Sequence, residues 1–439
     1  MIEFEYGQKI QIEPSGEATI ISKLGEGGQG VVYKIEFAGK IYALKWYKKN
    51  KINDNSRFRL NLERNILDGS ASKNFLWPLY ITKGIQYDSF GYVMNLKPKE
   101  YSNFTDILNA KETFSSLEAI INATLNIVKS FRDLHRAGKS YQDLNDGGFF
   151  INTKTGDVLI CDCDNVAPYG ENVGIAGKPG YMAPEVVCNQ SSPSIQTDKF
   201  SLAVILFKLL FRGDPLEGEK VIKSVCLTEE AERKHYGLEP VFVYDPQNET
   251  NRPVRGVHNN VIKFWKIFPG YIKDAFITSF TKGIKTPDER IIENQWFKYF
   301  VRLRGEIITC NCGFQNFVSG FLNDGNGKIH CLKCNRIYTT PLLLDIKKTP
   351  VVLFPGNKLY ECHTKALSDN HIKVTGEVIQ NKIKKGLFGI KNLSDSVWKA
   401  KLPNGKVLTI GKDSVVPILI GICIDFGDDN EANIVTMDN

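Results

Sequence analysis

Apolar and polar positions alternate near the start of the chain in a way that predicts three neighbouring strands. The stretches TIISKLG (19–25), VVYKIEF (31–37) and KIYALKWY (40–47) each show the two-residue period of a strand with one buried face. A turn at Ala38 and Gly39 joins the last two. The sequence therefore predicts a strand-rich region at the start of the chain.

A different period follows between residues 115 and 138. The positions of one face recur three or four residues apart from Leu117 to Leu134, and Gly138 follows as a C-terminal cap. This pattern predicts a long amphipathic helix. The region up to about residue 305 is thus expected to contain a small strand-rich part followed by a larger helix-rich part.

Beyond residue 305 the pattern changes twice. Four cysteines cluster between residues 310 and 334, and the last hundred residues or so show short alternating strands with turn signals such as Asn404-Gly405. We find no internal repeat. A chain of this length is expected to form two or three domains. The predicted boundaries are 1–305, 306–340 and 341–439.

The composition excludes several classes of protein. Of the 439 residues, 42% are hydrophobic and 24% are charged, which is ordinary for a globular chain and excludes wholesale disorder. The net charge of +7 suits ligands that carry phosphate but falls short of a nucleic-acid-binding surface. The first residues lack the pattern of a signal peptide, and the longest apolar runs are too short to span a bilayer. We expect a cytoplasmic protein with no nucleic-acid or membrane partner.

The glycines between the first two predicted strands have a spacing with chemical meaning. Gly25, Gly27 and Gly30, with Val32 two residues later, fit the pattern G-x-G-x-x-G-x-V, in which backbone N–H groups approach phosphate closely. Taken alone, the pattern fits a glycine-rich hairpin equally well. The residues that follow favour phosphate binding.

Four charged residues follow these glycines in an order that fits phosphoryl transfer. Lys45 lies on the next predicted strand and Glu63 on a predicted helix, where a carboxylate would hold the lysine against phosphates. Asp143 comes after the long helix, in place to accept a proton from a hydroxyl group. Asp162 ends an apolar strand, as a magnesium ligand would. A surface lysine and a solvated glutamate are the ordinary alternative for Lys45 or Glu63 alone.

Taken in order, these motifs resemble those of a eukaryotic-type protein kinase domain over about residues 20–305. The stretches GYMAPE, TDKFSLA and DERIIENQW continue the series, and Glu185 and Arg290 within them would form a structural ion pair. The resemblance implies an α+β fold with a small lobe at about 1–95 and a large lobe at about 96–305. It also implies ATP and Mg²⁺ or Mn²⁺ as cofactors and a protein as substrate.

The resemblance also assigns roles to individual residues. It implies that catalysis depends on Asp143, Lys45, Glu63 and Asn145. It implies that the nucleotide and its metal are bound by Gly25, Gly27, Gly30, Val32, Ala43, Lys45, Met94, Asn95 and Asp162.

Three positions depart from the family's pattern. Gly148 stands where an asparagine that binds a second magnesium is expected, so that ligand is missing. Asn145 and Asp164 stand where lysine and glycine are usual. We hypothesise that Asn145 or Asp164 completes the magnesium shell beside Asp162.

The expected regulation departs from the family's pattern as well. Gln142 occupies the place of the arginine that receives a phosphate on the activation loop, and residues 165–182 contain no serine or threonine. The sequence therefore predicts activity without phosphorylation of Ser or Thr in this loop.

The four clustered cysteines form two closely spaced pairs. Cys310 and Cys312 are followed, after eighteen further residues, by Cys331 and Cys334. Two tight turns that each present two thiolates close a tetrahedral site, which is the arrangement of a zinc ribbon with structural Zn²⁺. Four free thiols in a hairpin are the alternative.

The last hundred residues or so resemble a forkhead-associated β-sandwich, particularly in their second half. Members of that family bind phosphothreonine through an arginine after the first turn and a serine in the next loop. Here those places hold Gly356-Asn357 and Thr375-Gly376, so the arginine is absent. A sandwich without the pocket is at least as consistent with the sequence.

The order of kinase, cysteine pairs and β-sandwich resembles a bacterial kinase of the tellurite-resistance-associated kind. That resemblance implies a von Willebrand factor A-domain protein and a metal-dependent protein phosphatase as partners. Two functions remain open: an active Ser/Thr protein kinase, and a pseudokinase scaffold that binds nucleotide and recruits partners through the ribbon and the sandwich. Lys45, Glu63, Asp143 and Asp162 favour the enzyme, whereas Gly148 favours the scaffold.

Overall fold

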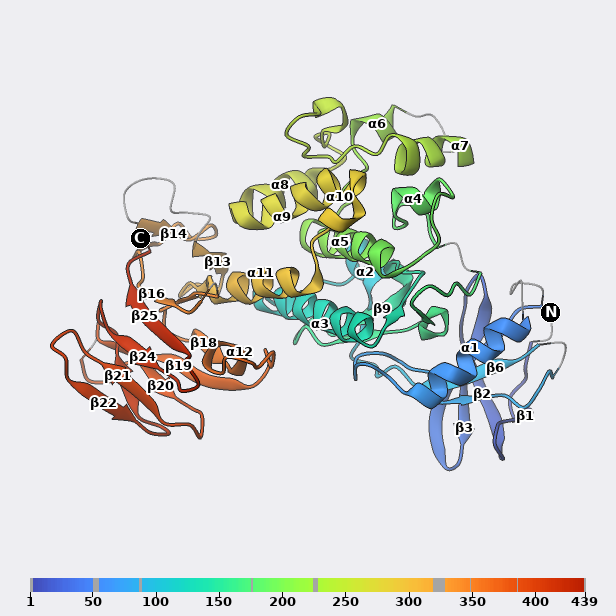
Figure 1. The fold of residues 1–439 in the computed structure, drawn as a ribbon, viewed down its shortest axis with the longest axis horizontal. Helices are drawn as coiled ribbons and strands as arrows, with labels where there is room; N and C mark the ends of the chain where they lie inside the picture. Colours follow the sequence, from blue (N-terminus) through green and yellow to red (C-terminus); the bar gives the residue numbers. More distant parts are fainter. Residues whose placement is uncertain are drawn as a thin grey trace. The chain divides into compact units, whose positions relative to one another are not determined.

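The structure is a computed structural model that describes residues 3–49, 55–86, 89–174, 177–223, 228–318, 328–347, 349–384 and 386–437. The chain forms two compact units (Figure 1). Unit 1 comprises residues 1–113, 126–262 and 275–293, and unit 2 comprises residues 114–125, 263–274 and 294–439. Residues 294–305, which the sequence assigned to the end of the kinase-like region, belong to unit 2.

Unit 1 contains an antiparallel six-stranded sheet in the order β1-β2-β3-β4-β6-β5. The three strands predicted from the alternating pattern are β2, β3 and β4, and the turn between the last two has positive φ at Ala38 and Gly39. The strands of this sheet are β1 (Lys9–Gln11), β2 (Glu17–Glu26), β3 (Gly30–Phe37), β4 (Lys40–Tyr47), β5 (Tyr80–Ile81) and β6 (Gly91–Asn95).

The helices give the chain its mixed α and β character. The predicted amphipathic helix is α3, and Gly138 after it has the positive φ of a C-terminal cap. Among the described residues, no helix is both long and apolar enough to cross a membrane. The helices are α1 (Asn55–Asp68), α2 (Phe104–Leu108), α3 (Leu117–Arg136), α4 (Pro184–Val187), α5 (Ile195–Phe211), α6 (Glu219–Ile222), α7 (Glu229–Glu232), α8 (Asn259–Ile267), α9 (Gly270–Phe280), α10 (Lys282–Lys285), α11 (Glu293–Gly305) and α12 (Glu361–Thr364).

Helix α1 packs on one face of the sheet of unit 1, where Phe58 makes an edge contact with Tyr47 of β4 (Figure 1). The amides of Asn61 and Asn65 both donate to the backbone carbonyl of Val166, at 2.8 and 2.7 Å. Phe58, Asn61, Leu62 and Asn65 recur at helical spacing, and this buried face fixes the rotation of α1 about its axis.

The rest of unit 1 is built around α5, which is buried along nearly its whole length, as expected for a helix that is apolar on every side. The predicted ion pair is present: the two terminal guanidinium nitrogens of Arg290 each donate to a carboxylate oxygen of Glu185 at 2.8 Å. Two small sheets lie beside the helices. They are formed by β7 (Ser102–Asn103), β9 (Phe149–Ile151) and β10 (Val158–Ile160), and by β8 (Lys139–Ser140) and β11 (Ala167–Pro168).

Unit 2 contains an all-β region with two sheets that share one apolar core. Residues of both sheets, among them Leu344, Leu359 and Trp398, belong to the same buried cluster. The first sheet has the order β17-β16-β25-β24-β21-β22 and the second the order β18-β19-β20-β23. The strands are β16 (Leu343–Asp345), β17 (Val351–Val352), β18 (Lys358–Tyr360), β19 (Val374–Gln380), β20 (Phe388–Asn392), β21 (Trp398–Lys401), β22 (Val407–Ile410), β23 (Val415–Pro417), β24 (Cys423–Asp425) and β25 (Glu431–Val435).

Two sequence expectations for this β region have different outcomes. Asn404-Gly405 does join a hairpin, between β21 and β22, and Gly405 has a φ of +83°. The loop expected at Thr375-Gly376 was wrong, because both residues lie within β19 and Thr375 is buried.

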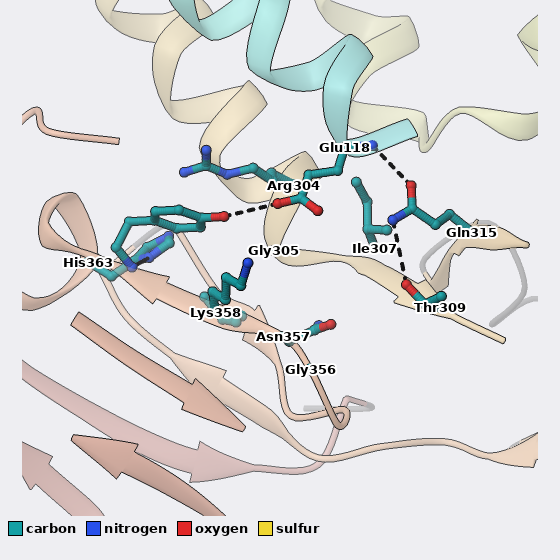
Figure 2. A pocket seen from close by; sticks show the side chains of 12 residues that line it. Glu118, Arg304, Gly305, Ile307, Thr309, Gln315, Gly356, Asn357, Lys358 and His363 are labelled. Carbon is teal, nitrogen blue, oxygen red and sulfur yellow. Dashed lines mark hydrogen bonds between the residues drawn. The ribbon is translucent and has the colours of Figure 1, made fainter. Parts of the chain in front are cut away.

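Figure 2 shows a small polar junction within unit 2 that involves α3, α11 and β18. The Tyr360 hydroxyl donates to the Glu118 carboxylate at 3.0 Å, and the Arg304 guanidinium lies 3.6 Å from the Tyr360 ring centre. Arg304 also donates to Asn122 at 2.9 Å. The pocket, with a volume of about 50 Å³, has room for a few water molecules, so we interpret it as part of the packing of unit 2.

Candidate active site

The candidate site is built on one face of strand β4. Side chains two residues apart on a strand point to the same side, so Ala43, Lys45 and Tyr47 share this face. The neighbouring strands add Val32 of β3 and Tyr92 of β6, which both pair directly with Lys45 in the sheet register. The alternation of β4 thus places a buried cation between apolar and phenolic side chains.

Lys45 is buried, and its ammonium group is held by three side chains. It donates to Asp162 at 2.8 Å, to the two carboxylate oxygens of Asp164 at 2.9 and 3.1 Å, and to the amide oxygen of Gln29 at 3.3 Å. Burial alone would lower the pKa of Lys45, but the two carboxylates outweigh it and raise this pKa above its ordinary value. The ammonium therefore stays charged.

The predicted pairing of Lys45 with Glu63 was wrong. Glu63 forms an ion pair with Arg59 one helical turn earlier, at 2.9 Å, and its side chain is partly exposed. The physical reason is the phase of α1. Because Leu62 is part of the buried face, Glu63 is rotated by about 100° away from it.

Asp164 lies where the sequence suggested a second magnesium ligand, but its surroundings argue against that role. Its side chain is fully buried. One carboxylate oxygen accepts from Lys45 and from the Tyr92 hydroxyl at 3.1 Å, and the other accepts from Lys45 and from the Tyr47 hydroxyl at 2.6 Å. Three donor groups thus satisfy this buried carboxylate, and the Lys45 ammonium contacts both of its oxygens. We therefore no longer assign Asp164 as a metal ligand.

Tyr47 and Tyr92 remain protonated and can donate. Burial, followed by the negative charge of Asp164, raises the pKa of each phenol well above its ordinary value. Neither tyrosine was predicted as a site residue. The strand alternation for Tyr47 and the pairing of β4 with β6 for Tyr92 are the signals that would have found them.

Asp143 and Asn145 lie in the segment that follows α3 and β8. The Asn145 amide donates to the Asp143 carboxylate at 2.9 Å, while its oxygen accepts from the backbone N–H of Gly147 at 2.9 Å. Burial, and to a lesser extent the charge of Asp162, raises the pKa of Asp143 above its ordinary value, although the Asn145 bond opposes this shift. Asn145 thus orients a carboxylate that is suited to accept a proton.

The structure supplies a physical reason for Gly148. A β-carbon at this position would lie 3.1 Å from the Tyr141 hydroxyl, which donates to the backbone carbonyl of Cys161. Tyr141 is fully buried. The phenol thus occupies the space that a side chain at position 148 would need.

The glycine-rich turn joins β2 to β3. No atom lies within 4 Å of a β-carbon built on Gly25 or Gly27, whereas one on Gly30 would lie 2.5 Å from the Trp46 carbonyl. The backbone carbonyl of Gln29 accepts from the Lys48 N–H at 2.8 Å. Gly30 is therefore required for strand packing, whereas Gly25 and Gly27 border open space.

The apolar wall of the site combines predicted and unpredicted residues. Val32, Ala43 and Met94 lie in one cluster, and Asn95 follows Met94 at the exposed end of β6. Phe150 of β9 packs against the same cluster, and the sequence analysis missed it. Its signal is its position two residues after Gly148 on an apolar strand. Together these residues can enclose a flat, apolar ring.

Comparison with known proteins identifies the family. A family model for the protein kinase domain matches residues 18–268, which is more than half of the chain. The chain belongs to the protein kinase family. The G protein-coupled receptor kinase 2 of Caenorhabditis elegans is 26% identical over 233 residues, which cover 49% of this chain and 32% of that protein.

Two further relatives are similar to part of this chain. The dual specificity protein kinase shkB of Dictyostelium discoideum is 25% identical over 53% of this chain and 34% of its own length. The human ribosomal protein S6 kinase alpha-2 is 24% identical over 61% of this chain and 37% of its own length. The chain thus spans about a third of the length of these curated relatives.

The segment of the kinase that follows Asp162 is held by Gln142. Its side-chain amide donates to the backbone carbonyl of Glu171 at 2.6 Å and accepts from the Val173 N–H at 3.3 Å. Residues 175 and 176 lie outside the described residues. The neighbouring β11 pairs with β8, and the Glu171 carboxylate forms an ion pair with Arg64 of α1 at 2.8 Å, so this segment is held by backbone, amide and ionic contacts.

The four cysteines of this kinase come together within unit 2. They lie at the turns of two hairpins, β12 (Ile307–Thr309) with β13 (Gln315–Phe317), and β14 (Lys328–His330) with β15 (Ile337–Thr339). Their sulfur atoms all lie within 4.8 Å of one another. The Cys310–Cys334 and Cys312–Cys331 sulfur pairs are 3.5 and 3.7 Å apart.

These sulfur distances fit a tetrahedral metal better than a disulfide. Zinc–sulfur bonds of about 2.3 Å place neighbouring sulfurs about 3.8 Å apart, whereas a disulfide requires about 2.05 Å. The backbone N–H of Cys312 and the Tyr338 hydroxyl lower the pKa of Cys310 to about 6, which favours a thiolate. The residues present therefore fit Zn²⁺.

Proposed function

We propose that this kinase transfers the γ-phosphoryl group of ATP to serine or threonine hydroxyls of a protein substrate. The observation that carries the proposal is the buried Lys45, which is held by Asp162 and Asp164 on the strand face that also carries Ala43. A fixed cation beside an accessible carboxylate is the arrangement that phosphoryl transfer needs, because its catalysis depends mainly on positioning and charge stabilisation.

Each residue has a distinct part in this reaction. Asp162 would hold Mg²⁺ or Mn²⁺, which when bound neutralises charge on the phosphates. Lys45 would contact the phosphates, and Val32, Ala43, Met94 and Phe150 would enclose the adenine. Asp143, oriented by Asn145, would accept the proton of the substrate hydroxyl.

The alternative function is a scaffold that binds nucleotide without transferring phosphate. The observation that favours it is Gly148, which provides no side chain for a second metal ion. Since Mg²⁺ commonly keeps several water ligands, one protein carboxylate is compatible with binding. We consider the retained Lys45, Asp143 and Asp162 the stronger argument, and they favour the enzyme.

The test of the proposed function is intact-mass detection of phosphate transfer from ATP in the presence of Mg²⁺ or Mn²⁺. The acceptors are the kinase itself and a generic basic protein. Transfer onto serine or threonine by wild type, lost in Lys45→Met, is the expected result. No transfer with either metal, together with intact nucleotide binding, would favour the scaffold.

We also propose that activity needs no phosphate on Ser or Thr between residues 165 and 182. Gln142 supplies neutral hydrogen bonds to Glu171 and Val173 where other kinases use a cation and a phosphate. Phosphatase treatment of the wild-type kinase is expected to leave kcat unchanged.

Removing the Gln142 side chain is expected to lower kcat by about tenfold. The change Gln142→Ala removes two hydrogen bonds to the half-buried backbone of Glu171 and Val173, each worth about 0.5–1.5 kcal/mol. Steady-state kinetics measures kcat for this variant and for the control Gln247→Ala, which changes an exposed residue. Full activity of Gln142→Ala would contradict the proposed anchoring.

For unit 2 we propose a zinc ribbon and a sandwich of the forkhead-associated kind. The sulfur geometry supports the zinc, and the two sheets with a shared core support the sandwich. The motif order supports a bacterial, tellurite-resistance-associated type, with a von Willebrand factor A-domain protein and a metal-dependent phosphatase as partners. Co-purification of tagged kinase with either partner tests this assignment.

A further inference from the structure

We propose that Asp164 is the positioning residue for Lys45 and takes the place of a helix glutamate in this kinase. The inference rests on the proposed nucleotide site and adds to it the group that fixes its lysine. It also implies that the orientation of Lys45 does not depend on helix α1.

The contacts of Asp164 are suited to hold Lys45 in one position. Its carboxylate accepts two bonds from Lys45, one from Tyr47 and one from Tyr92, and its side chain has no exposed surface. A buried carboxylate is stable only when it is paired and hydrogen-bonded, and these three donor groups meet that condition. Because the side chain is fully buried, a bound metal ion has no access to either oxygen.

Asp162 differs from Asp164 in the exposure of its side chain, which decides whether a ligand can reach it. Its side chain is 39% exposed, and only one of its oxygens accepts from Lys45. Asp162 is therefore free to bind a metal ion, while Asp164 keeps its bonds to Lys45. The two carboxylates thus have different roles: Asp162 would bind the metal ion, and Asp164 orients Lys45.

The positions of Tyr47 and Tyr92 on their strands place both phenol groups next to Lys45. Tyr47 lies two residues after Lys45 on β4, and Tyr92 lies directly opposite Lys45 on β6. Both phenols must therefore lie on the same face as the ammonium group. Their hydroxyl groups, which come from two different strands, both donate to Asp164 and fix the orientation of its carboxylate.

Helix α1 supplies no carboxylate to Lys45 in the described part of the chain. Its buried face presents Phe58 and Leu62, and Glu63 pairs with Arg59, which also bonds Glu13 at 2.8 Å. A shift of α1 would therefore break no ion pair of Lys45.

The experiment compares Asp164→Asn, Glu63→Gln and the matched exposed control Asp157→Asn. For each variant, kcat and KM for ATP are measured together with affinity for ADP in the presence of Mg²⁺. We expect Asp164→Asn to lower kcat/KM by about 10²-fold, mostly in kcat, because a displaced Lys45 no longer meets the transferring group. For Glu63→Gln and Asp157→Asn, kcat/KM is expected to stay within about twofold of the wild-type value. Exposed ion pairs contribute little net energy, so losing one such charge should have a small effect.

Two milder variants keep the test valid if Asp164→Asn folds poorly. Tyr47→Phe and Tyr92→Phe each remove one hydroxyl donor and keep the charge of Asp164. Each is expected to lower the melting temperature by a few degrees and also to lower the kcat of the folded protein several-fold. A purely structural role would lower the melting temperature but leave the kcat of the folded protein unchanged.

The outcomes separate this inference from the proposed function. Suppose that the wild type is active. If Asp164→Asn then keeps the wild-type kcat/KM, or if Glu63→Gln loses most of it, the inference is overturned and the proposed function stays intact. An inactive wild type that binds ADP, with binding weakened in Asp164→Asn but not in Glu63→Gln, would overturn the proposed function and support the inference. A wild type that binds no nucleotide would overturn both.

Discussion

Replacing Asp143 with asparagine is expected to lower kcat by about 10²- to 10⁴-fold, the range for loss of a general base. Asparagine keeps the size of the side chain but cannot accept the proton of the attacking hydroxyl. Because burial raises the pKa of the Asp143 carboxyl, this group is a better base than an exposed aspartate. Affinity for the nucleotide should change little, since Asp143 is not among the groups that hold Lys45.

Steady-state kinetics and ADP titration together check this prediction. Asn145→Ala should give a smaller loss than Asp143→Asn, because it removes the bond that orients the carboxylate but leaves the carboxylate itself. Asp157→Asn, at an exposed turn, serves as the matched control. Retention of the wild-type kcat by Asp143→Asn would show that Asp143 is not the base.

Disrupting the cysteine cluster is expected to have the second large effect. Structural zinc contributes apparent binding energies of about 10–16 kcal/mol in small zinc-binding peptides, and this energy stabilises the fold around the metal. Cys331→Ser removes a buried sulfur that accepts hydrogen bonds from the Lys333 N–H and from Asn316. We expect the bound zinc to fall from one ion per chain to none and β12–β15 to lose protection from hydrogen exchange.

Metal analysis of purified protein, followed by hydrogen exchange, measures both effects. The control is Cys423→Ser, because this half-buried cysteine on β24 lies outside the cluster. An equal zinc content in wild type, Cys331→Ser and Cys423→Ser would mean that the four thiols do not form a zinc site.

The sequence predicted the parts of the site that depend on strand period and chain order. Lys45 was assigned from its place on the strand after the glycines, Val32 from the glycine motif, and Ala43 from the resemblance to protein kinases. The ion pair of Glu185 with Arg290 was found because its two motifs lie in the expected order. These features depend on local patterns that a single sequence displays.

The partner of Lys45 could not be predicted because it depends on helical phase and on tertiary contacts. Glu63 and the buried Leu62 are neighbours in the sequence, yet a step of about 100° around α1 separates them. Asp164 was recognised as a departure from the family's pattern, but its role appears only when Tyr47 and Tyr92 are brought against it. The same holds for Gly148, whose explanation is the hydroxyl of Tyr141.

The central claim is that one site on β4 holds a metal-bound nucleotide between Lys45 and Asp162, beside Asp143. The most direct measurement is a crystal structure of the kinase with Mg²⁺ and a non-hydrolysable ATP analogue. We predict that the Lys45 ammonium contacts the phosphates while it keeps its bonds to Asp164, and that an oxygen of Asp162 binds the metal. A nucleotide bound elsewhere, or a Lys45 that leaves Asp164 to pair with Glu63, would contradict this account.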